Sequence, residues 1–533
     1  MTAVLRPAGN MAGPAWSIVV IMRPVLASLL LSTAAWTAAA AEEPAPPPAA
    51  VTAAPTTAAQ AKTEDPANAA PPNAAAATGT PAPAAPDRSL TASALQPLDQ
   101  RMEAYDQFRK LFETARFDEA LPLAQRVVEL SEAAANRENE RPIAYNNLAA
   151  TQYQLSDYAG AEFNYKKSLA LLEESQGISS PRMIVPLAGL GAVYAALDQH
   201  AQAAKLFDRA LAVSRRSLGL FNLAQLPLID QAADCRFALG DYGGVERDHF
   251  YALRIAEQHY GYDDPRTIPP AMKLAVFYES LKQFAAARGL YLRVRDVSLK
   301  ANPGYSPEAV KSLLGIGRTH RIQYTMEPGT LDSQQPAHDE VTGEIVGKVY
   351  RESRVPPPAA DRAGLKAIEQ ALALLRATTD PPKPLLTETL TELGDWYQAT
   401  SRASTAVPFY AEASTIYAAD AESAMNGNPL AAPRMIFYRA PLASTRGIGV
   451  ISGDVIIHQT QFSFDVNEDG DTENVTVVNT DMAEGQLAQS RRAIERAVYN
   501  PRFENGKPVA TQGVQFTSRW YEQRKTETPS TSS

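Results

Sequence analysis

Small residues recur every 41 or 42 positions through the middle of this 533-residue chain, and this repeat limits the fold more than any other feature. Aligned on the second half of each unit, they are Ala120, Ala161, Ala203, Val245 and Ala287. A large aromatic residue stands four positions after three of them, as Tyr165, Phe207 and Tyr291. Such self-similarity is typical of stacked helical hairpins, in which the small residues let two helices approach and the aromatic ring fills the space beside them.

The expected helix starts repeat with the same period. Their N-cap residues, 42 positions apart, are Ser180, Asn222, Asp264 and Ser306. Proline follows three of these four at the first helical position, where the missing N–H costs nothing. The caps therefore indicate the same repeat independently of the small residues.

Residues 322–357 interrupt the repeat, which resumes at Gly364 and ends with a clear unit containing Leu393-Gly394 and Tyr410. The step from Ala287 to Gly364 is 77 positions instead of 42, which gives an insertion of 35 residues. Insertions in a repeat array usually form a loop on one face, which is sometimes the binding face.

Over about residues 98–425 the pattern Leu-Gly-x-x-Tyr … Ala … Phe/Tyr … Ala resembles the tetratricopeptide repeat (TPR) family, in the 42-residue form seen in kinesin light chains. The resemblance implies a right-handed superhelix of helix pairs whose concave face binds peptides or proteins. In this family an Asn of the first helix often holds the backbone of the peptide, and Asn147 stands at the matching position. The equivalents are Gly189, Lys273 and Glu392, so a ladder of asparagines is absent. The alternative is that Asn147 is an exposed helix residue.

From about residue 430 the period of 42 stops and strand patterns begin. Phe462, Phe464 and Val466 alternate with polar residues, which predicts a half-buried strand. A turn at 467–471 leads to a second strand at 475–478. A helix follows, with an apolar stripe formed by Leu487, Ile494, Ala497 and Val498. After a loop at 501–509, a last strand covers 514–520. The order is ββαβ, a small α+β domain with an open edge strand.

Residues 430–525 resemble the C-terminal domain of TonB-family energy transducers. The motifs are Phe464-Asp465-Val466 … Asp469-Gly470, then Tyr499-x-Pro501 … Asn505-Gly506-Lys507-Pro508-Val509-Ala510, and Gly513-Val514. The family pairs this domain with a short segment of an outer-membrane receptor. The resemblance implies that the last strand does so here, with peptide-binding residues Val514, Gln515, Phe516, Thr517, Ser518, Arg519 and Trp520. Two departures put receptor pairing in doubt: the entry motif reads Phe437-Tyr438-Arg439-Ala440-Pro441, and Ala497 replaces the usual Trp.

The N-terminal 41 residues have the pattern of a secretory signal, with Arg23 before an apolar run and small residues up to Ala41. Translation from Met22 instead of Met1 would fit this pattern better. The alternative is an uncleaved membrane anchor, although several Ser and Thr dilute the run. Residues 42–95 are rich in Ala and Pro and predict a disordered linker, and residues 526–533 predict a disordered tail.

Charge and composition exclude several classes of function. With 50 Lys+Arg against 59 Asp+Glu, the net charge is −9, so no basic field draws the chain to nucleic acid. Cys235 is the only cysteine and is expected to be a small buried filler, while His200 and His249 are expected at the surface or in the groove. The spacing Asp465-x-Asn467-x-Asp469-Gly470 opens like a calcium loop, but position twelve is Thr476 instead of Glu, so a hairpin turn explains it better.

These patterns lead to one main hypothesis and two alternatives. The main one is an exported cell-envelope scaffold of a Gram-negative bacterium, without enzymatic activity, cofactor or metal, that binds envelope proteins, peptides or an outer-membrane receptor. The first alternative is an energy transducer anchored in the inner membrane, although the first histidine is His200 and the family's N-terminal coupling histidine is missing. The second is an enzyme site at His338, Asp339 and Glu340 of the insertion, but such polar loop clusters are usually solvated.

Overall fold

The computed structural model describes residues 97–133, 140–326, 336–338, 345–348, 362–419, 428–439 and 455–523. The expected signal, linker and tail, and most of the insertion, lie outside these residues. The chain divides into two compact units, 1–220 and 221–533, and each is described by itself.

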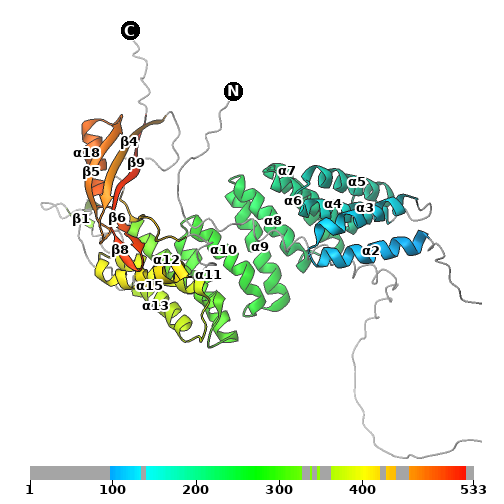
Figure 1. Cartoon of the computed structure of the whole chain (residues 1–533), viewed down its shortest axis with the longest axis horizontal. Coiled ribbons are helices and arrows are strands. Elements are labelled where there is room, and N and C mark those ends of the chain that lie inside the picture. Colours follow the sequence, from blue (N-terminus) through cyan, green and yellow to red (C-terminus); the bar gives the residue numbers. More distant parts are fainter. Residues whose placement is uncertain are drawn as a thin grey trace, which may run out of the picture. The chain divides into compact units, whose positions relative to one another are not determined.

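Helical hairpins make up the described part of the first unit (Figure 1). Its α-helices are α2 (Pro97–Glu113), α3 (Phe117–Ala133), α4 (Arg141–Gln154), α5 (Tyr158–Gln176), α6 (Ile184–Ala196) and α7 (His200–Leu218). The second unit continues the same pattern with α8 (Leu226–Ala238), α9 (Tyr242–Tyr260), α10 (Ile268–Ser280), α11 (Phe284–Ala301), α12 (Pro307–Met326), α13 (Arg362–Arg376), α14 (Lys383–Ala399) and α15 (Ala403–Ala419).

The repeated small residues lie where helices cross. The five residues that define the period are at most 1% exposed. Helix α6 also needs its glycines: a Cβ at Gly189 would lie 2.2 Å from a Tyr165 ring atom, and one at Gly191 would lie 2.9 Å from Phe207. Because these contacts leave no room for a side chain, the spacing of small and large residues determines how closely the helices pack.

The expected helix caps are present at three of the four positions. The side chains of Ser180 and Asp264 accept hydrogen bonds from the backbone N–H two residues later, and Ser306 accepts one from Ala309. Asn222 begins its helix without a side-chain cap bond. The three capped helices thus have one of their unsatisfied N–H groups paired.

The repeat between α8 and α9 departs from the pattern. His249 stands 42 positions after Phe207, so it occupies the aromatic position of its hairpin and contacts the Phe277 ring at 5.9 Å. His249 is half-buried at this position. Cys235 is buried in α8, as expected, and burial raises the pKa of its thiol to about 12.

The insertion separates the two helices of one hairpin. Helix α12 continues to Met326, past the expected start of the insertion at 322, and its partner α13 begins at Arg362. Between them β1 (Pro336–His338) and β2 (Ile345–Lys348) pair antiparallel. His338 lies in β1, whereas Asp339 and Glu340 lie outside the described residues.

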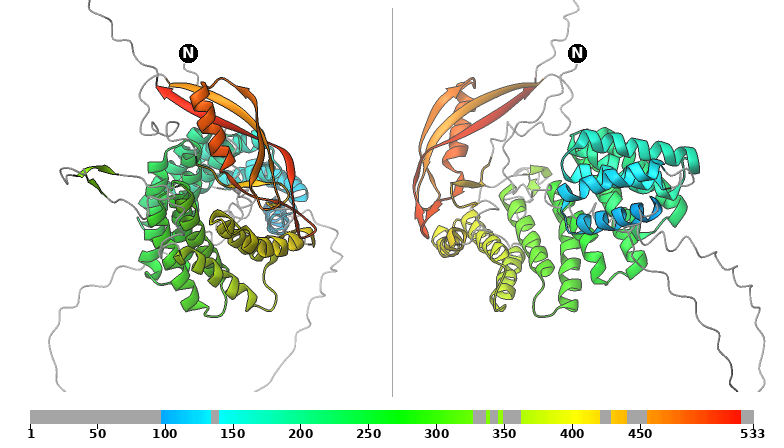
Figure 2. Two further views of the ribbon diagram at one scale, coloured as in Figure 1. Left: turned by 90° about the vertical axis from the view of Figure 1, so that its left-hand side faces the viewer. Right: turned by 45° about the vertical axis from the view of Figure 1, so that its right-hand side comes forward.

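A three-stranded antiparallel sheet forms the centre of the C-terminal region, in the order β5-β4-β9. The strands are β4 (Val455–Val466), β5 (Thr472–Thr480) and β9 (Thr511–Gln523). Helix α18 (Glu484–Glu495) packs on one face of this sheet (Figure 2). Its Ile494 belongs to the same core cluster as the buried side chains of Phe462, Phe464 and Val466.

Short strands complete this region and were not expected from the sequence. They form two antiparallel pairs, β3 (Arg434–Phe437) with β6 (Val498–Asn500), and β7 (Arg502–Glu504) with β8 (Lys507–Val509). The predicted loop at 501–509 is thus a hairpin. Helix α18 also ends at Glu495, so Ala497 and Val498 of the expected stripe lie beyond it.

Replacing Gly189 by Ala should destabilise the chain by about 1–3 kcal/mol, because its Cβ would overlap the Tyr165 ring. Gly289, in α11, is a matched control: nothing lies within 4 Å of an added Cβ, so Gly289→Ala should stabilise by up to about 1 kcal/mol through helix propensity. Urea denaturation of the full chain measures both. Equal effects of the two substitutions would contradict the packing argument.

Replacing His249 by Phe should remove a source of acid sensitivity. Burial, with a smaller contribution from Lys273, lowers the pKa of His249 to about 4. An ordinary histidine in the unfolded chain binds its proton near pH 6.5, so the stability contributed by neutral His249 is lost as the pH falls from about 6.5 to 4. Between these values the parent chain should lose on the order of 2 kcal/mol more stability than His249→Phe.

Urea denaturation at several pH values measures this difference. His259→Gln, an exposed position on the same helix, is the control and should follow the parent chain. Identical pH profiles for His249→Phe and the parent would contradict the buried state of His249.

Candidate functional site

The first helices of the hairpins in the second unit, α8, α10, α12 and α14, present a shared face. We call it the first-helix face and define it by three repeated positions. The Asn147 position is occupied by Gln231, Lys273, Gly315 and Glu392. Three residues later stand Asp234, Val276, Arg318 and Asp395, and another three later stand Phe237, Glu279, Arg321 and Gln398. In repeat arrays of this kind such columns form extended binding surfaces.

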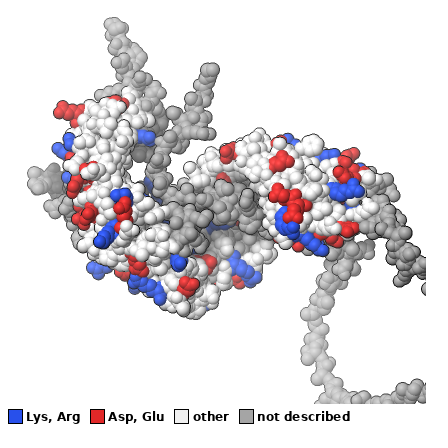
Figure 3. All heavy atoms as spheres, in the orientation of Figure 1, with Lys and Arg blue, Asp and Glu red and all other residues white. Residues whose placement is uncertain are grey.

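Ion pairs connect successive helices across this face. Asp230 and Lys273 join α8 to α10 with an N···O distance of 2.5 Å. Glu279 and Arg318 join α10 to α12, also at 2.5 Å, and Arg318 lies 3.5 Å from Glu388 of α14. The face is therefore charged but largely compensated. Figure 3 likewise shows acidic and basic side chains interspersed over the visible surface.

The deepest part of this network is centred on Asp395, which is 1% exposed. The Tyr410 hydroxyl donates to Asp395 at 2.9 Å, and Arg321 lies 3.5 Å away while donating to both oxygens of Glu392. Burial, reinforced by Asp395, raises the pKa of Tyr410 well above its ordinary value. Burial alone would lower the pKa of Arg321, but Glu392 and Asp395 raise it. With these raised pKa values the Tyr410 hydroxyl stays neutral and the Arg321 guanidinium stays charged at neutral pH.

The other partner of Asp395 comes from the C-terminal region. Nη2 of Arg434, in β3, donates to both Asp395 oxygens at 2.7 Å. One helical turn after Asp395, the Gln398 side-chain amide donates to the carbonyl oxygen of Asp469, in the turn between β4 and β5. The C-terminal region is thus bound to the first-helix face of the last hairpin.

Apolar packing continues this contact. Phe503 of β7 is buried in the same core as Trp396 and Tyr410, and its ring lies 5.6 Å from that of Tyr410. Leu430 is fully buried there, and its carbonyl accepts a hydrogen bond from the Phe503 N–H. The last hairpin and the C-terminal region therefore share one core.

Asn147, the expected peptide-binding residue of the repeats, lies on α4 of the first unit and is half-buried. Its backbone carbonyl accepts a hydrogen bond from the Thr151 hydroxyl four residues later in the same helix, and this bond does not involve the Asn147 side chain. At the equivalent positions, Lys273 and Glu392 are engaged in ion pairs. Asn147 belongs to the first unit, whereas the expected binding strand belongs to the second.

The expected binding strand lies in β9, at one edge of the sheet. Among the strands that the structure describes, β9 pairs with β4 alone, in register from Val455↔Gln523 to Val466↔Thr511. The side chains of Gln515, Thr517 and Arg519 are exposed, whereas Ser518 and Trp520 are buried and Val514 and Phe516 are half-buried.

Tyr438, which follows β3, covers the inner face of this strand. Its ring lies 4.9 Å from that of Phe516, and its hydroxyl is 3.3 Å from the Ser518 hydroxyl. The inner side chains of β9 are therefore held by the domain itself, so that a partner would meet the backbone edge and the exposed side chains.

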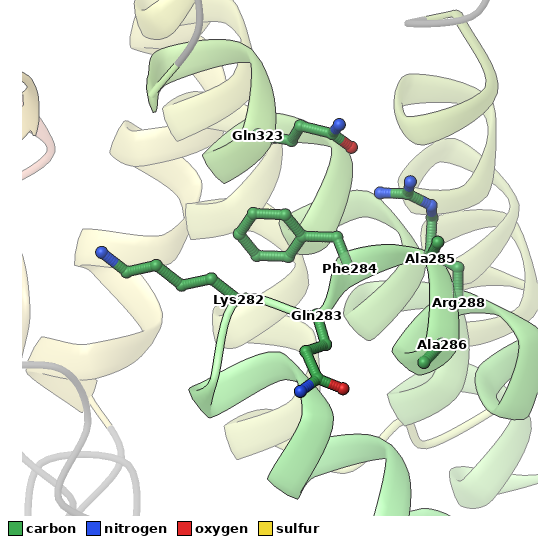
Figure 4. A pocket seen from close by; sticks show the side chains of 7 residues that line it. All are labelled: Lys282, Gln283, Phe284, Ala285, Ala286, Arg288 and Gln323. Atoms are coloured by element: carbon green, nitrogen blue, oxygen red, sulfur yellow. The ribbon is translucent and has the colours of Figure 1, made fainter. Parts of the chain in front are cut away.

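A pocket of about 500 Å³ opens beside the turn between α10 and α11 (Figure 4). Lys282, Phe284 and Arg288 line it, together with Gln323 of α12. One guanidinium nitrogen of Arg288 is buried without a hydrogen-bond partner in the described structure, and burial lowers the pKa of Arg288. The pocket contains none of the residues predicted to bind peptide.

The turn that resembles a calcium loop uses its polar atoms internally. Oδ1 of Asn467 accepts from the backbone N–H groups of Asp469 and Asp471, and Asp465 accepts from Asn474 and Gly513. Within the described residues no group of three His, Cys, Asp or Glu is placed to hold a metal ion. In the same part of the chain, no helix has the length and apolar character needed to cross a bilayer.

The chain thus consists of helical-hairpin repeats joined to a small α+β domain. Two family models match it: tetratricopeptide repeat over residues 187–222, and Gram-negative bacterial TonB protein C-terminal over residues 459–521. The chain is a TPR protein with a TonB C-terminal domain, and the predicted fold is confirmed. Both kinds of domain are typical of protein-interaction scaffolds without catalytic activity.

Several solved structures are similar to the repeat region. A putative kinesin light chain with nearly identical TPR-like repeats, from Podosopora anserina, is 18% identical, covers 39% of this chain and 99% of its own, and gives a TM-score of 0.36. BtubC (BKLC) from P. vanneervenii is 16% identical, with coverages of 49% and 91% and a TM-score of 0.36. A TPR protein of Thermus thermophilus is 21% identical, with 40% and 98% coverage and a TM-score of 0.28. No curated protein matches the chain.

Sequence reasoning missed the contact between Arg434 and Asp395. A signal was available in Leu393-Gly394-Asp395-Trp396, where an acidic residue directly follows the small residue at a helix crossing. A carboxylate at such a buried position requires a partner. Which cation supplies it could not be read from the sequence.

Replacing Arg434 by Ala should destabilise the full chain by roughly 2–4 kcal/mol, because Asp395 would stay buried with only Arg321 nearby. Urea denaturation followed by tryptophan fluorescence is suitable, since Trp396 and Trp520 are both buried on the two sides of this contact. Arg492→Ala, an exposed arginine of α18, should change stability by less than about 0.5 kcal/mol. A similar loss in both variants would contradict the central role of Arg434.

Proposed function

We propose that this protein is an exported cell-envelope scaffold of a Gram-negative bacterium. Its repeats would bind a peptide or protein, and its TonB-type domain would pair with a strand of a second partner. The observation that carries the proposal is that the edge strand β9 and the first-helix face belong to one body, joined by Arg434 and Asp395. The match to the TonB C-terminal model supports the envelope as the place of action.

Pairing at β9 would use the backbone. An extended segment placed beside Gln515–Arg519 would hydrogen-bond to the free side of the strand and contact its exposed side chains. The inner side chains are held by Tyr438 and the sheet core, so binding needs no rearrangement of the core. Asn147 would contribute to peptide binding on the repeats of the first unit.

The second candidate is an energy transducer anchored in the inner membrane. The TonB C-terminal match favours it as well. It requires an uncleaved N-terminus and a coupling group, whereas the first histidine of the sequence is His200. The scaffold instead predicts cleavage near Ala41 and release into the periplasm.

Expression of the full chain in a Gram-negative host, with a benzophenone amino acid at Thr517, tests both ideas. We expect a periplasmic species whose intact mass begins near Glu42, and a light-induced adduct with an envelope protein. Val478, exposed on the opposite edge strand β5, is the matched control position and should give no adduct. A Thr517→Pro variant should have a perturbed β9 edge, and it should therefore compete poorly with the parent chain for the same partner.

Equal adducts from the two edges, or none from Thr517, would contradict strand pairing at β9. An intact N-terminus retained in the inner membrane would overturn the exported scaffold in favour of the transducer.

A further inference from the structure

Asp234 and Asp395 stand at the same position of their repeats, three residues after the position of Asn147. In the last hairpin this position holds an arginine: both oxygens of Asp395 accept from Arg434 at 2.7 Å. Arg434 arrives there on a strand of the C-terminal domain. The last hairpin therefore shows how an arginine of a separate element can bind to the first-helix face.

Asp234 has no such partner. Its side chain is exposed on α8 and takes part in no hydrogen bond or ion pair within the described part of the chain. Lys273, whose charge acts on Asp234, is already paired with Asp230 at 2.5 Å. Although the side chain reaches solvent, the surrounding protein desolvates its carboxylate, and this effect, reinforced by the charge of Asp230, raises the pKa of Asp234 to about 6 against the opposing effect of Lys273. An incoming cation would therefore relieve an unfavourable charge.

The positions next to Asp234 on the first-helix face can be compared with the last hairpin in the same way. Phe237 corresponds to Gln398, which donates to the C-terminal domain through Asp469, yet Phe237 is 45% exposed. Val276, one repeat after Asp234, is 50% exposed. Both apolar side chains thus stay partly exposed on the first-helix face, whereas the C-terminal region covers this face in the last hairpin.

We propose that the α8–α10 part of the first-helix face binds an extended segment of a partner protein that carries an arginine, with the guanidinium on Asp234 and an apolar side chain on Phe237 and Val276. The proposal rests on the scaffold function proposed above and names the chemistry of one partner. Arginine is chosen because it is the residue that Asp395 receives, where Nη2 of Arg434 donates to both carboxylate oxygens. A planar guanidinium can also donate from two nitrogens at once, which a lysine ammonium cannot.

The chain itself supplies a suitable probe. A fluorescein-labelled peptide with the sequence of residues 430–438, Leu-Ala-Ala-Pro-Arg-Met-Ile-Phe-Tyr, carries the arginine that fits Asp395 followed by apolar residues. In the full chain Asp395 is already occupied, so the matching position still open is Asp234. Fluorescence anisotropy measures the affinity of this peptide and of its analogue with citrulline, a neutral arginine isostere, in place of arginine.

We expect the citrulline analogue to bind at least tenfold more weakly than the arginine peptide. Asp234→Asn should weaken the arginine peptide by the same factor and abolish the difference between the two peptides. Glu174→Gln, which removes one exposed acid from α5 of the first unit, is the control for net charge and should preserve the preference. Phe237→Ala should weaken both peptides alike.

Three outcomes would overturn the inference. They are absence of binding by the arginine peptide, equal affinity of the two peptides for the parent chain, and an arginine preference that survives in Asp234→Asn. The last outcome would indicate binding at another acid, such as Asp395 after displacement of Arg434. Binding without arginine preference would leave the scaffold function intact and reject only this choice of partner.

Discussion

The carboxylate of Asp395 is the constraint on which the second unit depends. It directly follows Gly394, whose missing side chain allows Tyr410 to approach α14, and it is then enclosed by Arg321, Tyr410 and Arg434. Burying this carboxylate without a cation beside it would lower the free energy of unfolding by several kcal/mol, roughly the penalty for one unpaired buried charge. Repeat packing and attachment of the C-terminal domain therefore meet at one residue, and neither is complete without the other.

The contact between Arg434 and Asp395 connects β9, the proposed strand-pairing edge, with the first-helix face of the last hairpin. Strand β9 pairs with β4, which leads into the turn at Asp469 that Gln398 holds. It also contacts Tyr438, which follows β3 and thus lies close in sequence to Arg434. The shared core of Phe503, Trp396 and Tyr410 adds an apolar contact that is insensitive to salt. Under the proposed function, strand pairing at β9 and binding on the repeats of the second unit would thus take place on one body, which suits a scaffold and would equally suit a protein that transmits force.

The parts of the fold that depend on a regular spacing could be predicted from the sequence. The period of 42 identified the helix crossings and the caps at Ser180 and Asp264, because small residues, aromatics and N-caps each act locally. Strands of three or four residues such as β6 and β7 are too short to show an alternation, and the sheet edge was predicted only because β9 is long. The pairing of Arg434 with Asp395 joins two domains, so no local pattern could reveal it.

Hairpins that lack the large aromatic residue of the pattern include the one with Ala124 at that position and the one formed by α8 and α9, which also departs at other positions. In α8 and α9, Val245 replaces the small alanine, His249 replaces the aromatic ring, and Asp234 and Phe237 stand exposed on the first-helix face. Local rules are expected to fail where a surface serves binding more than packing. In the last hairpin the same columns are filled by the chain's own domain, and its packing residues, Gly394, Ala406 and Tyr410, follow the pattern. In the hairpin of α8 and α9 the same columns stay exposed. There we expect the contacts to be made by a partner instead of by the protein's own core.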